Sequence, residues 1–140
     1  MKINIIYDTK YGNNKKIAEY VKNSLENNNV KTFFVKDTDP DYIRSADLYI
    51  FSTPTQMGKA TKKVRRFVKN LKIDGKNVKY GLITTYAKEK TDSLSKLEKM
   101  LKRKGCKKAV ENLKLKIEGK KGNLEEGYEQ KIDKFLEKLT

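Results

Sequence analysis

The sequence predicts an α/β protein in which one open, five-stranded parallel sheet is covered by helices on both faces. Short apolar runs alternate with amphipathic stretches of helical length along the whole chain. Alternation of strands with helices is typical of an open parallel sheet covered on both faces. The length of 140 residues suits one domain over 1–140, with a single sizeable core.

The expected strands are runs of apolar and β-branched residues. The first run, 2–7, is typical of a buried strand. A fifth run alternates apolar and charged residues, so we expect it to be half-exposed. The polar segment 37–45 is too short for more than a helical turn. The predicted strands are 2–7, 31–35, 47–52, 77–85 and 109–117.

Apolar residues at helical spacing mark four helices that follow these strands. Asn13 or Asn14 is a candidate N-cap for the first helix, the second is expected over 58–71, and the third ends near Gly105. The apolar positions are Ile17, Ala18, Val21 and Leu25 in the first helix, Val64, Phe67, Val68 and Leu71 in the second, Leu94, Leu97, Met100 and Leu101 in the third, and Leu124, Tyr128, Ile132, Phe135, Leu136 and Leu139 in the last.

Charge is distributed unevenly along the chain. The net charge of +15 comes from 33 basic and 18 acidic residues. Residues 1–58 carry 8 basic and 7 acidic side chains, a net charge of +1, and residues 59–140 carry 25 and 11, a net charge of +14. Such an asymmetry indicates either an anionic partner or a lysine-rich surface that keeps the protein in solution.

Histidine is absent and Cys106 is the only cysteine, which excludes several kinds of chemistry. The commonest metal ligand and general base is missing, so neither a zinc site nor a Cys/His nucleophile pair is expected. No disulfide can form within the chain, so we expect a cytoplasmic protein. Cys106 is expected to be a structural or incidental residue. No run of 18 apolar residues exists, so no membrane insertion is expected.

Topology predicts where a ligand binds. Open parallel sheets bind ligands beyond the carboxyl ends of the strands, where the strand order reverses. The two common orders are the Rossmann order and 2-1-3-4-5, and in the second the reversal lies between strands 1 and 3. The connecting segments of interest are therefore 8–14, 52–59 and 84–91.

The first of these segments can hold a phosphate or merely cap a helix. Thr9 offers a hydroxyl, Gly12 permits a left-handed or close-approach backbone, and Asn13 and Asn14 open a helix whose free N–H groups attract anions. The segment lacks the Gly-Lys-Ser/Thr of a Walker loop and the three glycines of a dinucleotide-binding fingerprint.

The second and third segments can cover a planar ring. Met57 is flexible and polarisable and packs well on flat rings, although it can equally fold into the core. Gly58 allows a peptide to flip. Tyr86 follows a strand end, where its ring either covers a planar ligand or closes the core.

Together these segments resemble the short-chain flavodoxins and the flavodoxin domain of flavodiiron proteins over essentially the whole chain. The phosphate loop of that family, Ser/Thr-x-Thr-Gly-x-Thr, is matched at Thr9, Gly12 and Asn13, with an aromatic variant at Tyr11 and a departure at Asn14. The matching stretches are Thr9-Lys10-Tyr11-Gly12-Asn13-Asn14, Thr53-Pro54-Thr55, Met57-Gly58 and Thr85-Tyr86. Ala87 replaces a family glycine, and Lys88 replaces the tryptophan that stacks on the outer flavin face.

The resemblance implies a flavodoxin-like three-layer sandwich of order 2-1-3-4-5 that binds FMN and transfers electrons, more as a carrier than as an enzyme with its own substrate. It also implies that Met57 packs on the inner flavin face and that the Gly58 peptide flips to bond the reduced ring. The implied cofactor-binding residues are Thr9, Lys10, Tyr11, Gly12, Asn13, Asn14, Thr53, Pro54, Thr55, Gln56, Met57, Gly58, Thr85, Tyr86 and Ala87.

Typical flavodoxins are acidic, whereas this chain is basic, and residues 59–73 are strongly so. They contain no acidic residue, and their cations are Lys59, Lys62, Lys63, Arg65, Arg66, Lys69 and Lys72. We therefore expect a redox partner with an acidic docking surface. The alternative is a flavodoxin-fold binding module that has lost or weakened FMN binding and docks an acidic partner or nucleic acid through this face. Nucleic acid is not favoured, because Phe67 is the only aromatic residue among these cations.

Overall fold

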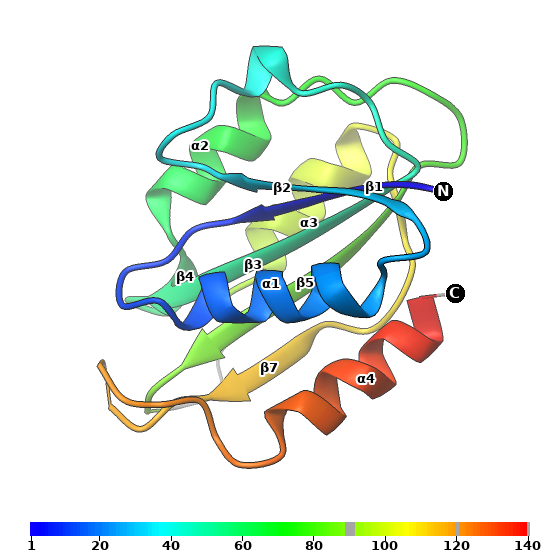
Figure 1. The fold of residues 1–140 in the computed structure, drawn as a ribbon. Helices are drawn as coiled ribbons and strands as arrows, with labels where there is room; N and C mark the ends of the chain where they lie inside the picture. Colours follow the sequence, from blue (N-terminus) through cyan, green and yellow to red (C-terminus); the bar gives the residue numbers. More distant parts are fainter. Residues whose placement is uncertain (89–91, 120, 140) are drawn as a thin grey trace.

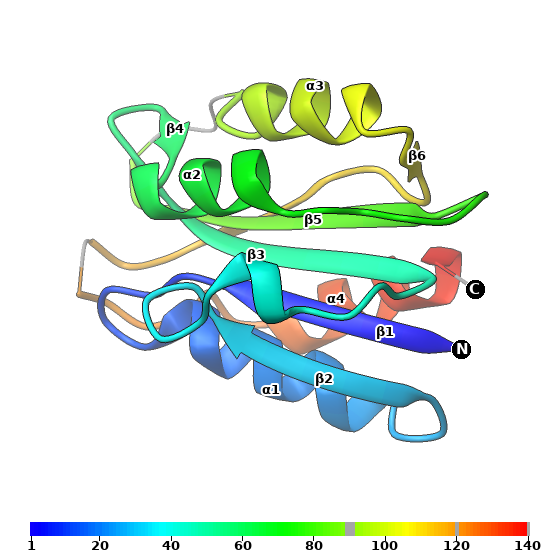
Figure 2. The ribbon, with the colours of Figure 1, turned by 90° about the horizontal axis from the view of Figure 1, so that it is seen from above.

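The computed structural model describes residues 1–88, 92–119 and 121–139 and forms three layers. A parallel sheet lies between one pair of helices on each face, α1 with α4 and α2 with α3 (Figure 1). Seen from above, the three layers are separate (Figure 2). The strands are β1 (Lys2–Tyr7), β2 (Asn29–Phe34), β3 (Leu48–Gln56), β4 (Lys59–Ala60), β5 (Lys79–Tyr86), β6 (Lys107–Lys108) and β7 (Leu113–Lys116). The helices are α1 (Asn13–Ser24), α2 (Lys62–Asn70), α3 (Ser95–Arg103) and α4 (Tyr128–Leu139), with a 3-10 turn at Pro40–Tyr42.

The strand order confirms the predicted fold class. Neighbouring strands run β2-β1-β3-β5, all parallel, and β6 and β7 both pair with the outer edge of β5. The order reverses between β1 and β3, as expected for the 2-1-3-4-5 arrangement. The carboxyl ends of β1, β3 and β5 therefore meet at one edge of the sheet.

The fifth predicted strand is interrupted. Lys107–Lys108 pairs with the start of β5 and Leu113–Lys116 with its end. Residues 109–112 form no strand, although the Ala109 N–H still donates to the Tyr80 carbonyl at 2.9 Å. Glu98 of α3 holds both sides of the break, because its carboxylate lies 3.1 Å from Lys108 Nζ and accepts a hydrogen bond of 2.7 Å from Asn112. The prediction of one continuous strand over 109–117 was wrong for this reason.

The core has one layer on each face of the sheet. The buried residues of α1 and α4 pack against Ile3, Ile5 and Ile50, and those of α2 and α3 pack against Ile6 and Phe51. This follows the alternation of side chains along each strand. Cys106 lies in the second layer, where burial raises the pKa of its thiol, so it behaves as a structural residue rather than a reactive one.

The starts of two predicted helices differ from the structure. The second helix begins at Lys62 rather than within 58–61, because Lys59–Ala60 pairs with β3 and Thr61 caps the helix through Val64 N–H. The last helix begins at Tyr128, and Leu124 instead forms a β-bridge with Ile117. No helix in the described ranges is both long and apolar enough to span a bilayer.

Candidate functional site

The loop after β1 forms a closed turn ahead of α1. The backbone N–H of Thr9 donates to Asp8 Oδ1 at 2.9 Å, and the N–H of Gly12 donates to Thr9 Oγ1 at 2.9 Å. Gly12, not Asn13 or Asn14, is the N-cap of α1, and its φ of 98° is one that side-chain-bearing residues rarely adopt. The first helical bond runs from Lys16 N–H to Gly12 C=O, so the N–H groups of the first turn are left for an anion.

Asn14 turns its side chain into the protein. It is 2% exposed, its Nδ2 donates to Ser52 Oγ at 3.2 Å, and its Oδ1 accepts from Thr85 Oγ1 at 3.2 Å. The amide lies beneath the loop and joins it to the ends of β3 and β5. Asn14 therefore offers an anion its backbone N–H, while its side chain fixes the position of the loop.

Asn13 joins the loop to a segment that the sequence did not point to. Its Nδ2 donates to the carbonyl of Gly122 at 2.8 Å. That carbonyl belongs to a reversal that is held together by the Ile117–Leu124 bridge and by a bond from Glu118 N–H to the Asn123 carbonyl. A Cβ placed on Gly122 would lie 1.4 Å from the Glu118 carbonyl oxygen, so only glycine fits there.

Tyr11 is the exposed aromatic residue of the phosphate-loop motif. Its side chain is 44% exposed, and the ammonium groups of Lys10 and Lys121 lie 5.5 Å and 5.7 Å from its ring centroid. Both distances allow a cation–π contact. The segment after β7 thus reaches the loop through Lys121 as well as through Gly122.

β3 continues past the sheet into a hairpin with β4. Thr55 pairs with Ala60 and Gln56 with Lys59, so the turn consists of Met57 and Gly58. Their φ values of 52° and 74° are both positive, which is the combination of a type I′ turn. Met57 is fully exposed, so it does not fold into the core.

Hydroxyl groups hold the ends of β3 and β5 together. The Thr55 and Thr84 hydroxyls share a hydrogen bond of 2.8 Å, and Thr55 also donates to Ser93 Oγ at 3.0 Å. Thr53 is fully buried and accepts from the N–H of Thr61 at 3.3 Å. The side chains of Thr53 and Thr55 therefore set the position of the hairpin.

A large cavity lies at this edge of the sheet and brings ten of the fifteen predicted residues together. Its volume is about 750 Å³. Ile117 is the lining residue that sequence reasoning missed, because its place depends on pairing far along the chain. The lining consists of Lys10, Tyr11, Pro54, Thr55, Gln56, Met57, Gly58, Thr85, Tyr86, Ala87, Lys88 and Ile117. We call it the ring cavity.

A second cavity of about 470 Å³ adjoins the ring cavity and shares Lys10, Pro54 and Gln56 with it. Lys62, Lys63 and Arg66 line its other side, together with Thr9, Thr61 and Asp8. The Asp8 carboxylate is buried and accepts the Thr61 hydroxyl and the Thr9 N–H, so it is occupied by internal bonds. We call this space the cationic cavity.

The remaining predicted residues support the loop instead of lining the ring cavity. Thr9 lines the cationic cavity, and Gly12, Asn13, Asn14 and Thr53 line neither space. In the described ranges, no three Cys, Asp or Glu side chains are grouped as metal ligands.

Positive charge is crowded around the hairpin. Lys59 of β4 lies close to Lys96 of α3, and repulsion between the two ammonium groups lowers the pKa of Lys96. Lys62, Lys63 and Arg66 are exposed nearby and make no ion pair within residues 1–88, 92–119 and 121–139. The hairpin therefore carries a surface suited to anions.

Comparison with known proteins gives consistent matches. The sequence profile of the flavodoxin family matches residues 5–135. A flavodoxin of Aquifex aeolicus (strain VF5) is 36% identical over 84 residues, which cover 54% of this chain and 45% of that protein, so the match spans less than half the relative's length.

Solved structures share the fold. The oxidised Flavodoxin 2 from Bacillus cereus superposes with a TM-score of 0.82 at 22% identity, covering 99% of this chain and 97% of that one. The Streptococcus pneumonia TIGR4 flavodoxin gives a TM-score of 0.79 at 21% identity, with coverages of 99% and 97%. Because the profile covers nearly the whole sequence, the chain belongs to the flavodoxin family, whose members bind FMN and transfer electrons to redox partner proteins.

Proposed function

We propose that this chain binds one FMN between the ring cavity and the first turn of α1 and acts as an electron carrier. The observation that carries the proposal is the position of the ring cavity. It lies beside a helix N-terminus with free N–H groups, at the reversal of the strand order.

The phosphate end fits the first turn of α1. That turn contains no acidic residue that would compete with a phosphate. The Thr9 hydroxyl oxygen accepts a hydrogen bond from the Gly12 N–H. The hydrogen of that hydroxyl is therefore still available to donate to a phosphate oxygen. A Cβ on Gly12 would meet no atom within 4 Å, so the space above the turn is open.

The ring end fits the ring cavity. Its volume of about 750 Å³ lies within the usual range for small-molecule sites. Tyr86 and the exposed Met57 lie on its walls and supply the contacts for the two faces of a planar ring. Gly58 lies at the tip of the hairpin turn with a φ of 74°, and a glycine there permits the alternative peptide orientation that would face the ring edge.

When bound, the flavin supplies the redox chemistry, and the side chains bind and orient it. No side-chain acid, base or nucleophile is needed, which agrees with a carrier more than with an enzyme that has its own substrate. The single buried thiol agrees with a cytoplasmic location.

The partner is proposed to be acidic at its docking surface. The cationic cavity shares a wall with the ring cavity, so a partner that places carboxylates on Lys62, Lys63 and Arg66 also approaches the flavin. Electrostatic attraction of this kind raises the association rate and weakens with salt.

A second candidate is a binding module of this fold without flavin. The observation that favours it is Lys88, an exposed cation on the ring cavity where a stacking aromatic would add about 0.5–1.5 kcal/mol. The two candidates differ in whether FMN binds at all.

Titration with FMN while following flavin fluorescence decides between them. We expect quenching at micromolar protein and a loss of at least tenfold in affinity for Gly12→Val, because valine is strained at a φ of 98°. Gly105→Val is the matched control. Gly105 has a φ of 89° and similarly open surroundings, but it follows α3 away from the site. No quenching with the unaltered chain supports the binding module.

A further inference from the structure

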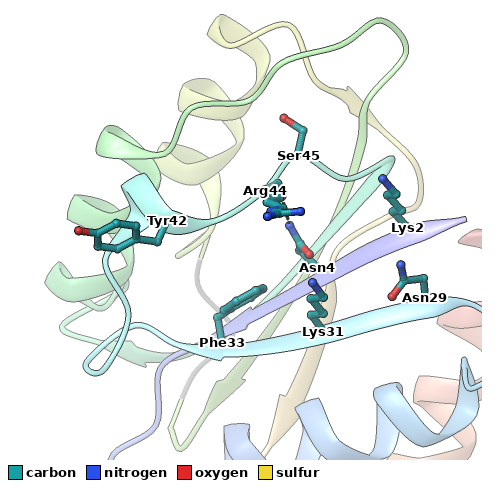
Figure 3. Close-up of a pocket in the computed structure, with 8 residues that line it drawn as sticks. All are labelled: Lys2, Asn4, Asn29, Lys31, Phe33, Tyr42, Arg44 and Ser45. Carbon is teal, nitrogen blue, oxygen red and sulfur yellow. Dashed lines mark hydrogen bonds between the residues drawn. The ribbon is translucent and has the colours of Figure 1, made fainter.

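A third cavity lies on the face covered by α2 and α3, at the amino-terminal halves of β1 and β2 and thus away from the proposed FMN site. Its volume is about 270 Å³, and Figure 3 shows the side chains that line it. It is lined by Lys2, Asn4, Asn29, Lys31, Phe33, Tyr42, Arg44 and Ser45. We call it the strand-start cavity.

Three cations from three segments line this cavity without an acidic residue among the lining. Lys2 comes from β1, Lys31 from β2, and Arg44 from the segment before β3. Within the described parts of the chain none of the three side chains forms an ion pair. The nearby Asp47 carboxylate instead accepts the backbone N–H of Lys2 at 2.8 Å.

This grouping is not a simple result of the high overall charge. Residues 1–58 carry 8 basic and 7 acidic residues, a net charge of +1, yet three of those eight cations line one small cavity. Like charges that share a concave surface repel one another, and a bound anion removes that repulsion.

Hydrogen bonds hold the backbone segments that line the strand-start cavity. Asn4 is 5% exposed, and its Nδ2 donates to the Arg44 carbonyl at 2.9 Å. Asp47 N–H donates to the Lys2 carbonyl at 2.9 Å, and Ala46 N–H donates to Tyr49 Oη at 3.2 Å. The segment that carries Arg44 is thereby attached to β1, so its position is set before any ligand arrives.

We propose that the strand-start cavity binds a phosphate group, either free phosphate or the terminal group of a phosphomonoester. Arg44 supplies a planar fork that matches phosphate oxygens in pairs, and Lys2 and Lys31 supply point charges. Asn29 and Ser45 add neutral hydrogen-bonding groups. Tyr42 is 84% exposed and its ring points away from the cations in Figure 3, so the half-buried Phe33 provides the apolar wall.

The test is a titration followed residue by residue with two-dimensional ¹H–¹⁵N NMR on the FMN-free protein. The probes are inorganic phosphate and ribose 5-phosphate, each added at constant ionic strength so that screening does not change. The variant is Lys2→Gln, Lys31→Gln and Arg44→Gln together. The control, Lys22→Gln, Lys134→Gln and Lys138→Gln, removes the same net charge from exposed positions on α1 and α4.

Saturating shifts at Lys2, Asn4, Lys31 and Arg44, with a dissociation constant below about 1 mM, support the proposal. The cavity variant is expected to weaken binding at least tenfold and the control variant less than twofold. If only ribose 5-phosphate saturates, the ligand is a phosphomonoester, and saturation by both probes assigns the site to any phosphate. The proposal is overturned if neither probe gives saturating shifts, or if the cavity variant and the control variant lose the same amount of phosphate affinity.

Residue-resolved shifts also separate this proposal from the FMN proposal. Phosphate that perturbs only residues 9–16 overturns the strand-start site and leaves the FMN site supported. If the chain fails to bind FMN but phosphate causes saturating shifts in the strand-start cavity, the strand-start site is supported and the FMN site is overturned.

Discussion

The Thr85 hydroxyl donates a hydrogen bond of 3.2 Å to Asn14 Oδ1, and this bond connects the loop before α1 to the end of β5. Tyr86, the next residue along the chain, lines the ring cavity. One buried amide therefore links the proposed phosphate end of the site to its proposed ring end.

Removing that amide should weaken both folding and FMN binding. Asn14→Ala removes the amide that bonds the buried Ser52 and Thr85 hydroxyls, so that Ser52 keeps only its long bond of 3.5 Å to the backbone carbonyl of residue 14. This costs about 1–3 kcal/mol of unfolding free energy. Chemical denaturation and FMN titration measure the two effects. Asn13→Ala is the comparison, because it breaks a part-buried bond and should cost only about 0.5–1.5 kcal/mol. An Asn14→Ala protein as stable as the unaltered one contradicts the proposed link.

Gly122 should be intolerant of any side chain. A methyl group cannot fit 1.4 Å from the Glu118 carbonyl oxygen, so Gly122→Ala must move the Gly122 carbonyl that Asn13 holds. We expect FMN affinity to fall several-fold while the sheet stays folded by circular dichroism. Gly119→Ala, at a φ of 70° with open surroundings, should change FMN affinity less. If both substitutions lower FMN affinity equally, backbone strain alone explains the loss, and the Asn13–Gly122 bond has no specific role in FMN binding.

Met57→Asn should separate stability from binding. Asparagine tolerates a φ of 52° better than methionine, so the unfolding free energy should rise by up to about 1 kcal/mol. FMN affinity should fall, because the thioether contact with the ring is lost. Tyr42→Asn is the control, because it also removes a large exposed side chain but at a residue without positive φ. It should change neither the unfolding free energy nor the FMN affinity. Tighter FMN binding by Met57→Asn contradicts the role given to Met57.

Neutralising the cationic cavity should slow electron transfer with an acidic ferredoxin. For Lys62→Gln, Lys63→Gln and Arg66→Gln together, we expect at least a tenfold lower association rate at low salt and a weaker dependence on salt. The midpoint potential of the bound flavin should also fall, because nearby positive charge favours the anionic reduced form. Stopped-flow kinetics and potentiometry measure these changes. The control is Lys22→Gln, Lys134→Gln and Lys138→Gln, and equal slowing by that variant attributes the effect to net charge alone.

Alkaline pH should destabilise the fold through two buried tyrosines. Tyr49 and Tyr80 are fully buried, and desolvation raises the pKa of each phenol above its usual value of 10.0. The folded state therefore holds these protons to a higher pH than the unfolded chain does. Stability is retained below pH 10 and falls above it, by up to about 1.4 kcal/mol per pH unit for each tyrosine. Denaturation at pH 9 and pH 11 tests this, and Tyr80→Phe should reduce the pH dependence.

The sequence was sufficient for the layers, the strand order and the edge of the sheet where the ring cavity lies. These depend on hydrophobic patterning, which survives small errors at the ends of elements. The sequence could not show that Lys59–Ala60 pairs with β3, because the hairpin depends on a methionine with positive φ. Nothing in the pattern signals that exception.

The contacts that sequence reasoning missed at the site join residues far apart in the chain. Asn13 bonds to Gly122, which lies 109 residues away, and Asn14 bonds to Thr85, 71 residues away. A local motif records which residue types are present but not which way each amide turns. For the same reason, the loop motif could not show that the side chains of Asn13 and Asn14 form hydrogen bonds within the protein.

The break at residues 109–112 also affects how two copies of this chain can meet. A long, unbroken outer strand offers another molecule a row of free backbone groups on which to extend the sheet. Here that rim consists of two separate runs, Lys107–Lys108 and Leu113–Lys116, each bearing two lysines. A second copy would find too few consecutive backbone groups and too much like charge, so this border of the molecule resists fibril-like stacking.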